Sequence, residues 1–177
     1  MKLIILDRDG TINHDSDQYI KSPAEWKPLK GSLEAIALLT QNGYRVMVAT
    51  NQSGIARGLF DMATLNSIHG VMHKAVALAG GRIDAVFFCP HAADANCECR
   101  KPNPGMLIEI GRRMNVALDG VPFVGDGLRD LQAAAAVGAL PVLVLTGKGR
   151  NTQKDGGLPE GTLVFPDLAA FVNDFLK

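Results

Sequence analysis

The stretch Lys2–Gly10, "KLIILDRDG", decides the fold expected for this chain. Its four consecutive apolar residues, Leu3–Leu6, show no polar alternation, which is typical of a short strand buried on both faces of a parallel sheet. Asp7 and Asp9 follow at once, and Gly10 lets the backbone turn after them. The segment therefore predicts a buried strand with two carboxylates at its carboxyl end.

The rest of the chain alternates in the same way between apolar runs and helical spacing. Further strands are predicted at residues 44–50, 84–89, 121–126, 140–146 and 162–167. Helices are predicted at residues 33–41, 62–79, 105–114, 129–137 and 168–176, with Ser32 and Asp61 as N-caps of the first two. Residues 147–161 are the most loop-like segment. This order predicts a doubly wound parallel α/β sheet forming one domain over residues 1–177.

The composition restricts the classes of function that are expected for the chain. The chain has 177 residues, of which 47% are hydrophobic, and its 18 basic and 18 acidic residues cancel, which argues against a nucleic-acid partner. The apolar run Leu3–Leu6 is too short for a signal peptide or a membrane span, so we expect a cytoplasmic protein. Three cysteines cannot all pair in one chain, and a reducing compartment favours metal binding over disulfides.

Polar residues follow three of the predicted strands. Asp7 ends the first, Thr50 and Asn51 end the second, and Asp126 ends the fourth. Ligands of open parallel α/β sheets bind beyond the carboxyl ends of the strands, so these side chains are expected at one rim. Each has an ordinary alternative as a turn or strand-closing residue, and Asp126 could also cap the helix that follows it.

All three cysteines lie in "FFCPHAADANCECRKP", residues 87–102. Cys89, Cys97 and Cys99 with His91 make a closed set of three thiolates and one imidazole, as structural Zn²⁺ sites use. Three unrelated thiols in a flexible loop are the alternative. Because the loop runs directly into Arg100 and Lys101, a bound zinc would fix the position of both basic residues.

Four motifs occur in order along the chain: "DRDGTIN", "ATNQSG", "RKP" and "VGDGLRD". Together they resemble the four motifs of the haloacid dehalogenase-like phosphatases. The cysteine loop ahead of Arg-Lys-Pro, and "TNQSGIARG", are similar to the branch of this family that holds heptose bisphosphate phosphatases and histidinol phosphatases. The segments between the motifs are too short for a large cap domain, so an open site is expected.

The resemblance implies roles for individual residues. Asp7 would be the nucleophile and Asp9 the general acid and base, because a carboxylate nucleophile divides phosphate-ester hydrolysis into two easier steps. Mg²⁺ would be held by the Asp7 side chain, the Asp9 backbone carbonyl and Asp126. Thr50 and Lys101 would stabilise the transferring phosphoryl group. The expected substrate contacts are Asp15, Ser16, Asp17, Gln18, Tyr19, Thr50, Asn51, Gln52, Ser53, Arg100 and Lys101.

For the other polar residues the sequence either leaves two roles open or indicates no special role. Asp130 is either a second carboxylate behind the metal ligands or an acidic residue in the first turn of a helix. His69 and His73 are four apart on the long predicted helix, but no carboxylate lies at the spacing of zinc proteases. We therefore expect both, and His14, on a solvated surface.

The expected function is Mg²⁺-dependent removal of the 7-phosphate of a heptose 1,7-bisphosphate through an aspartyl-phosphate. That reaction would supply nucleotide-activated heptose for lipopolysaccharide, with zinc in a structural role. Histidinol-phosphate phosphatase is the alternative that shares every motif, and a catalytically silent, zinc-stapled binding module is an alternative of another class. The expected partner is a small sugar phosphate, with no nucleic acid and no membrane, and the expected state is a monomer.

Overall fold

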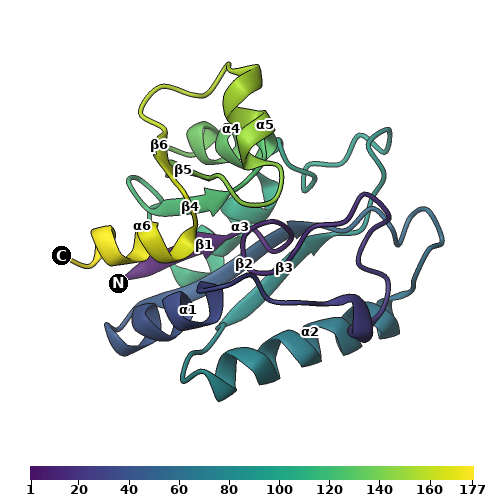
Figure 1. Ribbon diagram of the computed structural model, residues 1–177. Helices are drawn as coiled ribbons and strands as arrows, with labels where there is room; N and C mark the ends of the chain where they lie inside the picture. Colours follow the sequence, from purple (N-terminus) through teal and green to yellow (C-terminus); the bar gives the residue numbers. More distant parts are fainter.

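The computed structural model describes residues 1–177, and its centre is a parallel sheet of six strands in the order β3-β2-β1-β4-β5-β6 (Figure 1). β1 lies inside the sheet and pairs with β2 and β4, so successive strands are added outward in both directions. The predicted doubly wound α/β fold is confirmed. The strands are β1 Leu3–Leu6, β2 Arg45–Asn51, β3 Ala85–Cys89, β4 Pro122–Gly125, β5 Leu140–Val144 and β6 Leu163–Phe165.

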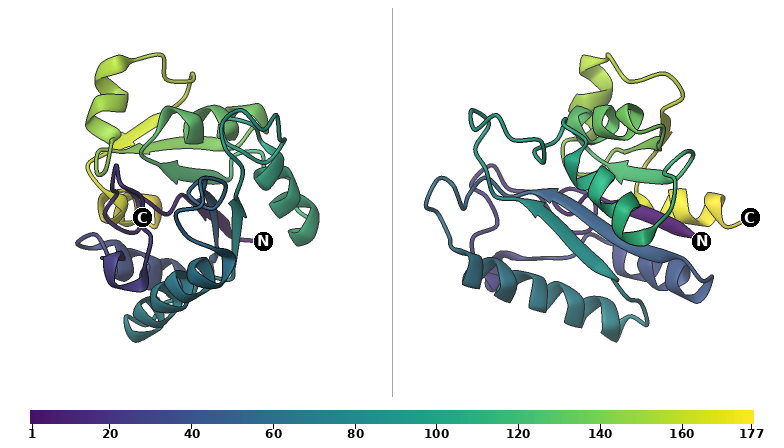
Figure 2. Two further views of the ribbon diagram at one scale, coloured as in Figure 1. Left: turned by 90° about the vertical axis from the view of Figure 1, so that its right-hand side faces the viewer. Right: turned by 180° about the vertical axis from the view of Figure 1, so that it is seen from behind.

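Helices cover both faces of this sheet. They are α1 Ser32–Gln41, α2 Met62–Leu78, α3 Gly105–Met114, α4 Leu128–Ala136, α5 Gly149–Asp155 and α6 Leu168–Phe175, with a 3-10 turn η1 at Pro23–Glu25. α1, α2 and α6 pack on one face, and α3 and α4 pack on the other, as the views of Figure 2 show for α2 and α3. Between β1 and α1 the chain holds only η1, and there is no large cap.

β1 explains why its apolar run is unbroken. Ile4 and Leu6 belong to the core under α1, α2 and α6, whereas Leu3 and Ile5 belong to the core under α3 and α4. Since successive side chains of a strand point to opposite faces, a strand buried on both faces needs an apolar residue at every position. All four side chains are buried, and Asp7 is the first polar residue after them.

The helix signals are confirmed except at two places. Asp61 caps α2, since its carboxylate accepts a hydrogen bond from Thr64 N at 2.8 Å. Ser32 is not a cap, because Gly31 holds that position and the Ser32 hydroxyl donates to the Thr11 carbonyl instead. The prediction of a loop over residues 147–161 is wrong in part, because α5 occupies residues 149–155. None of the helices combines the length and apolar character that a membrane span requires.

Candidate active site

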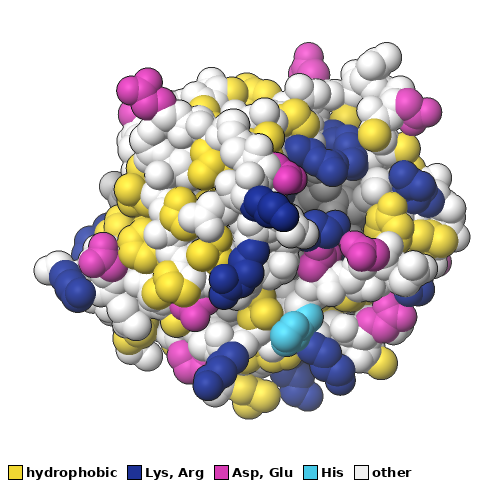
Figure 3. Space-filling view, turned by 45° about the horizontal axis from the view of Figure 1, so that its top comes forward, with side chains coloured by type: hydrophobic (Ala, Val, Ile, Leu, Met, Phe, Trp, Pro, Cys, Tyr) yellow, Lys and Arg dark blue, Asp and Glu magenta, His cyan; other side chains and the backbone are white.

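The polar residues at the strand ends converge on one cavity of about 180 Å³, which has no hydrophobic side chain in its lining. It lies beyond the carboxyl ends of β1, β2 and β4, as expected for an open parallel sheet. A space-filling view shows a hollow flanked by Lys and Arg side chains with acidic side chains beside them (Figure 3). The cavity is lined by Asp7, Asp9, Asp15, Thr50, Asn51, Lys101, Asp126, Gly127, Arg129, Asp130 and Lys148.

Three buried carboxylates are crowded in this cavity. One oxygen each of Asp7, Asp126 and Asp130 lies within 4.8 Å of the others. Burial, with the Asp130 charge adding to it, raises the pKa of Asp7 well above its usual range and that of Asp126 to about 7. Such a set of hard oxygen donors with mutual repulsion fits a small divalent cation such as Mg²⁺.

Gly10 allows the loop after β1 to approach Asp126. Its φ of 82° lies in the left-handed region, and a Cβ at this position would collide with the Asp126 carboxylate. The glycine of the "DRDG" stretch therefore allows both the turn and the close approach of the loop after β1 to Asp126.

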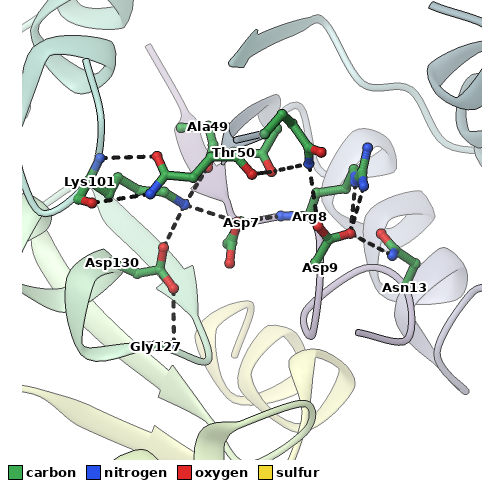
Figure 4. A network of polar contacts seen from close by, with 11 residues as sticks. Asp7, Arg8, Asp9, Asn13, Ala49, Thr50, Lys101, Gly127 and Asp130 are labelled. Atoms are coloured by element: carbon green, nitrogen blue, oxygen red, sulfur yellow. Dashed lines mark hydrogen bonds and ion pairs between the residues drawn. The ribbon is translucent and has the colours of Figure 1, made fainter. Parts of the chain in front are cut away.

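Lys101 is the counter-charge of the cluster (Figure 4). Its ammonium donates to Asp7 Oδ1 at 2.9 Å, to Asp130 Oδ1 at 2.6 Å and to the Ala49 carbonyl at 2.8 Å, so its three donors are all used. Burial alone would lower the pKa of Lys101, but Asp130 and Asp7 raise it above its ordinary value. Asn51 fixes the backbone of Lys101 through hydrogen bonds to both its N–H and its carbonyl.

The two carboxylate oxygens of Asp9 are held unequally. Its Oδ1 accepts hydrogen bonds from Arg8 Nε at 2.9 Å, Arg8 Nη2 at 2.8 Å and Asn13 Nδ2 at 2.9 Å. Its Oδ2 accepts only from Gln52 Nε2, at 3.3 Å. Gln52, expected at the substrate, is buried and also donates to Thr50 Oγ1 at 2.9 Å. The Asp9 side chain lies outside the group of three carboxylates.

The two carboxylates of "VGDGLRD", Asp126 and Asp130, make different contacts. Gly127, not Asp126, is the N-cap of α4, so the cap interpretation of Asp126 is wrong. Asp126 Oδ2 instead accepts a hydrogen bond from Lys148 N at 2.8 Å. Asp130 fits both interpretations left open for it, since it accepts from Gly127 N at 3.0 Å in the first turn of α4 and also contacts Lys101.

The other expected substrate residues are distributed around two further cavities. Asp15, Ser16 and Asp17 line a cavity of about 620 Å³, which shares Asp15 and Lys148 with the first. Arg100 and Lys101 line one of about 290 Å³. Gln18, Tyr19 and Ser53 line none of these three cavities.

Sequence reasoning missed three residues of this region. Arg129 lines both the cavity of the three carboxylates and that of Arg100, and Lys148 forms ion pairs with Asp15 and Asp17 at 3.5 Å each. The expectation of a solvated His69 is wrong, whereas His14 and His73 are exposed as expected. The available signal for His69 was its place four residues after Leu65, on the core side of α2.

The cysteine loop brings its four soft donors together. His91 Nδ1 lies 3.4 Å from Cys89 Sγ and 3.2 Å from Cys99 Sγ, and Cys97 Sγ lies 3.6 Å from Cys89 Sγ. No disulfide joins the cysteines. Burial raises the pKa of the Cys89 thiol to about 12, so a cation is needed to make it a thiolate. The cluster could hold Zn²⁺, whose structural sites use this donor set.

The fold and the carboxylate cavity together define a hydrolase of the haloacid dehalogenase-like class. The model of a HAD-hydrolase-like family matches residues 98–171. The D-glycero-beta-D-manno-heptose-1,7-bisphosphate 7-phosphatase of Bordetella bronchiseptica is 62% identical over 177 residues, covering 100% of this chain and 99% of the relative. The phosphatase of the same name from Pseudomonas putida is 54% identical over 176 residues, covering 99% and 100%.

A solved structure gives the same result. The crystal structure of the B. bronchiseptica D,D-heptose 1,7-bisphosphate phosphatase complexed with magnesium and phosphate superposes with a TM-score of 0.98 at 62% identity, covering 99% of this chain and 98% of that one. The chain belongs to the family of D-glycero-beta-D-manno-heptose-1,7-bisphosphate 7-phosphatases.

Proposed function

We propose that this chain is a Mg²⁺-dependent phosphatase that removes the 7-phosphate of D-glycero-beta-D-manno-heptose 1,7-bisphosphate, in the supply of nucleotide-activated heptose for lipopolysaccharide. The observation that carries the proposal is the cavity in which Asp7, Asp126 and Asp130 meet Lys101, in a chain that matches its heptose bisphosphatase relative from end to end. Mg²⁺, held by the Asp7 side chain, the Asp9 backbone carbonyl and Asp126, would neutralise the phosphate dianion and the crowded carboxylates.

Asp7 is the nucleophile of the proposed reaction. Its Oδ1 accepts hydrogen bonds from Lys101 Nζ and from Arg8 N, whereas its Oδ2 accepts none from the protein. The free Oδ2 attacks the phosphorus, the bond between phosphorus and the sugar oxygen breaks, and an aspartyl-phosphate forms. The sugar oxygen leaves as an alcohol because it takes a proton from Asp9.

Asp9 acts again in the second half of the reaction. It accepts a proton from a water molecule, whose oxygen attacks the phosphorus and breaks the bond to Asp7 Oδ2. Inorganic phosphate leaves and both carboxylates return to their first state. The sum is one phosphate ester and one water consumed, and one alcohol and one inorganic phosphate released.

The basic side chains around the cavity bind two different anionic groups of the substrate, the phosphoryl group in transfer and the remote phosphate. Lys101, together with the Thr50 hydroxyl, stabilises the phosphoryl group in transfer. Arg100 binds the remote phosphate together with Arg129, since both line a cavity of about 290 Å³ without an acidic residue and neither forms an ion pair. The segment with Asp15, Ser16 and Asp17 contacts sugar hydroxyls, and Lys148 holds it in place.

The remaining parts of the proposal concern the whole chain. Zn²⁺ bound by Cys89, His91, Cys97 and Cys99 is structural, because four protein donors leave no open position for water. Residues 1–177 act as one domain, since all strands join one sheet, and the chain acts as a monomer. The three free thiols favour the reducing cytoplasm.

A turnover comparison tests the substrate. Purified protein with Mg²⁺ is given the heptose bisphosphate or histidinol phosphate, and phosphate release is followed with and without EDTA. We expect kcat/KM to favour the bisphosphate by about 100-fold or more, because only it offers a remote phosphate to the arginines. Preference for histidinol phosphate would make that alternative correct. Release of no phosphate from either would point to a silent binding module.

A further inference from the structure

A buried arginine and a buried histidine lie behind the catalytic cavity without a part in the proposed reaction. Arg8 is fully buried, and His69 of α2 is 6% exposed. Arg8 Nη1 lies 3.0 Å from His69 Nε2, a contact across 61 residues of sequence. A buried guanidinium charge is costly unless its donors are satisfied, so the partners of Arg8 are informative.

The contact fixes the state of the imidazole. A guanidinium has only donors, so Nη1 donates and His69 Nε2 must accept with its lone pair. The remaining imidazole proton then belongs to Nδ1, and the ring is neutral. Burial, with the Arg8 charge adding to it, lowers the pKa of His69 to about 3, in agreement with this state.

The other donors of Arg8 determine how Asp9 lies. Nε and Nη2 both donate to Asp9 Oδ1, which also accepts from Asn13 (Figure 4). Oδ1 is therefore occupied by three donors, and Oδ2 has only the 3.3 Å contact from Gln52. Oδ2 is the oxygen left to exchange a proton with a substrate in the cavity that Asp9 lines.

We infer that His69 is a positioning residue of the phosphatase, which orients the Arg8 guanidinium so that Asp9 presents Oδ2 to the leaving oxygen. The inference rests on the proposed function of Asp9. With an apolar residue at position 69, the Nη1 donor of a buried cation would lose its acceptor. The guanidinium would turn toward another acceptor, and the carboxylate bonded to it would turn with it.

Three variants separate this role from packing. In His69→Gln the side-chain amide oxygen can take the place of Nε2, whereas in His69→Asn it is too short to reach Arg8. His69→Leu keeps an apolar volume without any acceptor. His73→Leu, on the exposed side of the same helix, is the matched control.

The leaving group provides the readout. An alkoxide needs the proton that Asp9 supplies, but p-nitrophenolate leaves without one. We expect His69→Leu and His69→Asn to lower kcat/KM for the heptose bisphosphate by about 30-fold and for p-nitrophenyl phosphate by less than about threefold. His69→Gln and His73→Leu should stay within about threefold of the wild type for both substrates.

Three results would overturn the inference: an equal loss for both substrates, a Gln variant as impaired as the Leu variant, or no loss in any variant. If the Leu variant does not fold, the polar Asn variant decides alone. ¹⁵N spectra of the imidazole give a readout independent of turnover, and a protonated Nε2 in the wild type would equally contradict the inference. The proposed function fails separately, through a wild type that does not hydrolyse the bisphosphate.

Discussion

Potential metal ligands lie together in two regions of the molecule, which differ in the secondary structure that carries the ligands. Asp7 follows β1, Asp126 follows β4, and Asp130 lies in the first turn of α4. All three are buried. In the second set, Cys89 is the buried last residue of β3, whereas His91, Cys97 and Cys99 lie on the segment without helix or strand between β3 and α3, and His91 is exposed. In each region the ligand atoms lie within 4.8 Å of one another.

This difference separates what a cation does in each place. The carboxylates are positioned by the ends of β1 and β4 and by the first turn of α4, and Lys101 offsets part of their charge. Of the thiols only Cys89 belongs to the sheet, as the last residue of β3. We therefore expect a bound metal to order the loop that carries the other donors. Because Lys101 follows Cys99 by two residues, we expect loss of order in the second region to displace the Lys101 charge in the first.

The largest effect is expected at Asp7, the proposed nucleophile. Asp7→Asn should lower turnover of the bisphosphate by about 10⁴-fold or more, because a neutral amide cannot attack phosphorus. Its melting temperature should not fall, since one repelling carboxylate is gone. Phosphate release and calorimetry measure both, with Asp174→Asn, an exposed carboxylate of α6, as control. A metal fluoride that mimics the phosphoryl group should bind at Asp7, and its binding at another side chain would refute the assignment.

The two basic residues behind the cysteine loop should separate in kinetics. Lys101→Ala should lower kcat by about 100-fold for both a bisphosphate and a monophosphate of the same sugar, because its charge matters as the transition state forms. Arg100→Ala should raise KM about tenfold for the bisphosphate alone, because only that substrate has a remote phosphate to lose. An equal penalty of Arg100→Ala on both substrates would remove the remote-phosphate role and favour a monophosphate substrate.

Loss of a ligand in the second region should lower the stability of the protein more directly than its activity. Cys97→Ser should lower zinc content, lower the melting temperature by about 10 °C and reduce activity by about tenfold through displacement of Lys101. Elemental analysis, calorimetry and turnover of the same preparation measure this, and Ala95→Ser in the same loop keeps all four ligands as a control. A zinc-free wild type with full activity and stability would contradict the contrast between the regions.

A further effect should appear in the pH dependence of stability rather than in turnover. The fold lowers the pKa of His69 from 6.5 to about 3, so the unfolded chain binds the proton more readily than the folded one. This contribution is complete above pH 6.5 and is lost as pH falls toward 3. The urea midpoint of the wild type should therefore fall more steeply over that range than that of His69→Gln. Parallel curves would show that His69 does not titrate in this way.

Much of the fold could be predicted because its signals are local. The unbroken apolar run of β1 and the cap at Asp61 act within a few residues of sequence. α5 was missed since its segment carries loop-like residues and its support is distant: the Thr152 hydroxyl donates to the Asp126 carbonyl at 2.7 Å. Ser32 was misassigned because its hydroxyl finds an acceptor, the Thr11 carbonyl, that only folding brings near.

Strand period and spacing along the chain are enough to specify the parallel sheet, the rim where its polar residues meet and the four soft donors of one loop. Only the tertiary structure decided which groups pair. Lys101 reaches Asp7 across 94 residues, and Arg8 reaches His69 across 61. The carboxylates of Asp130 and Asp7 keep Lys101 charged despite its burial, whereas burial together with the Arg8 charge makes His69 a neutral acceptor.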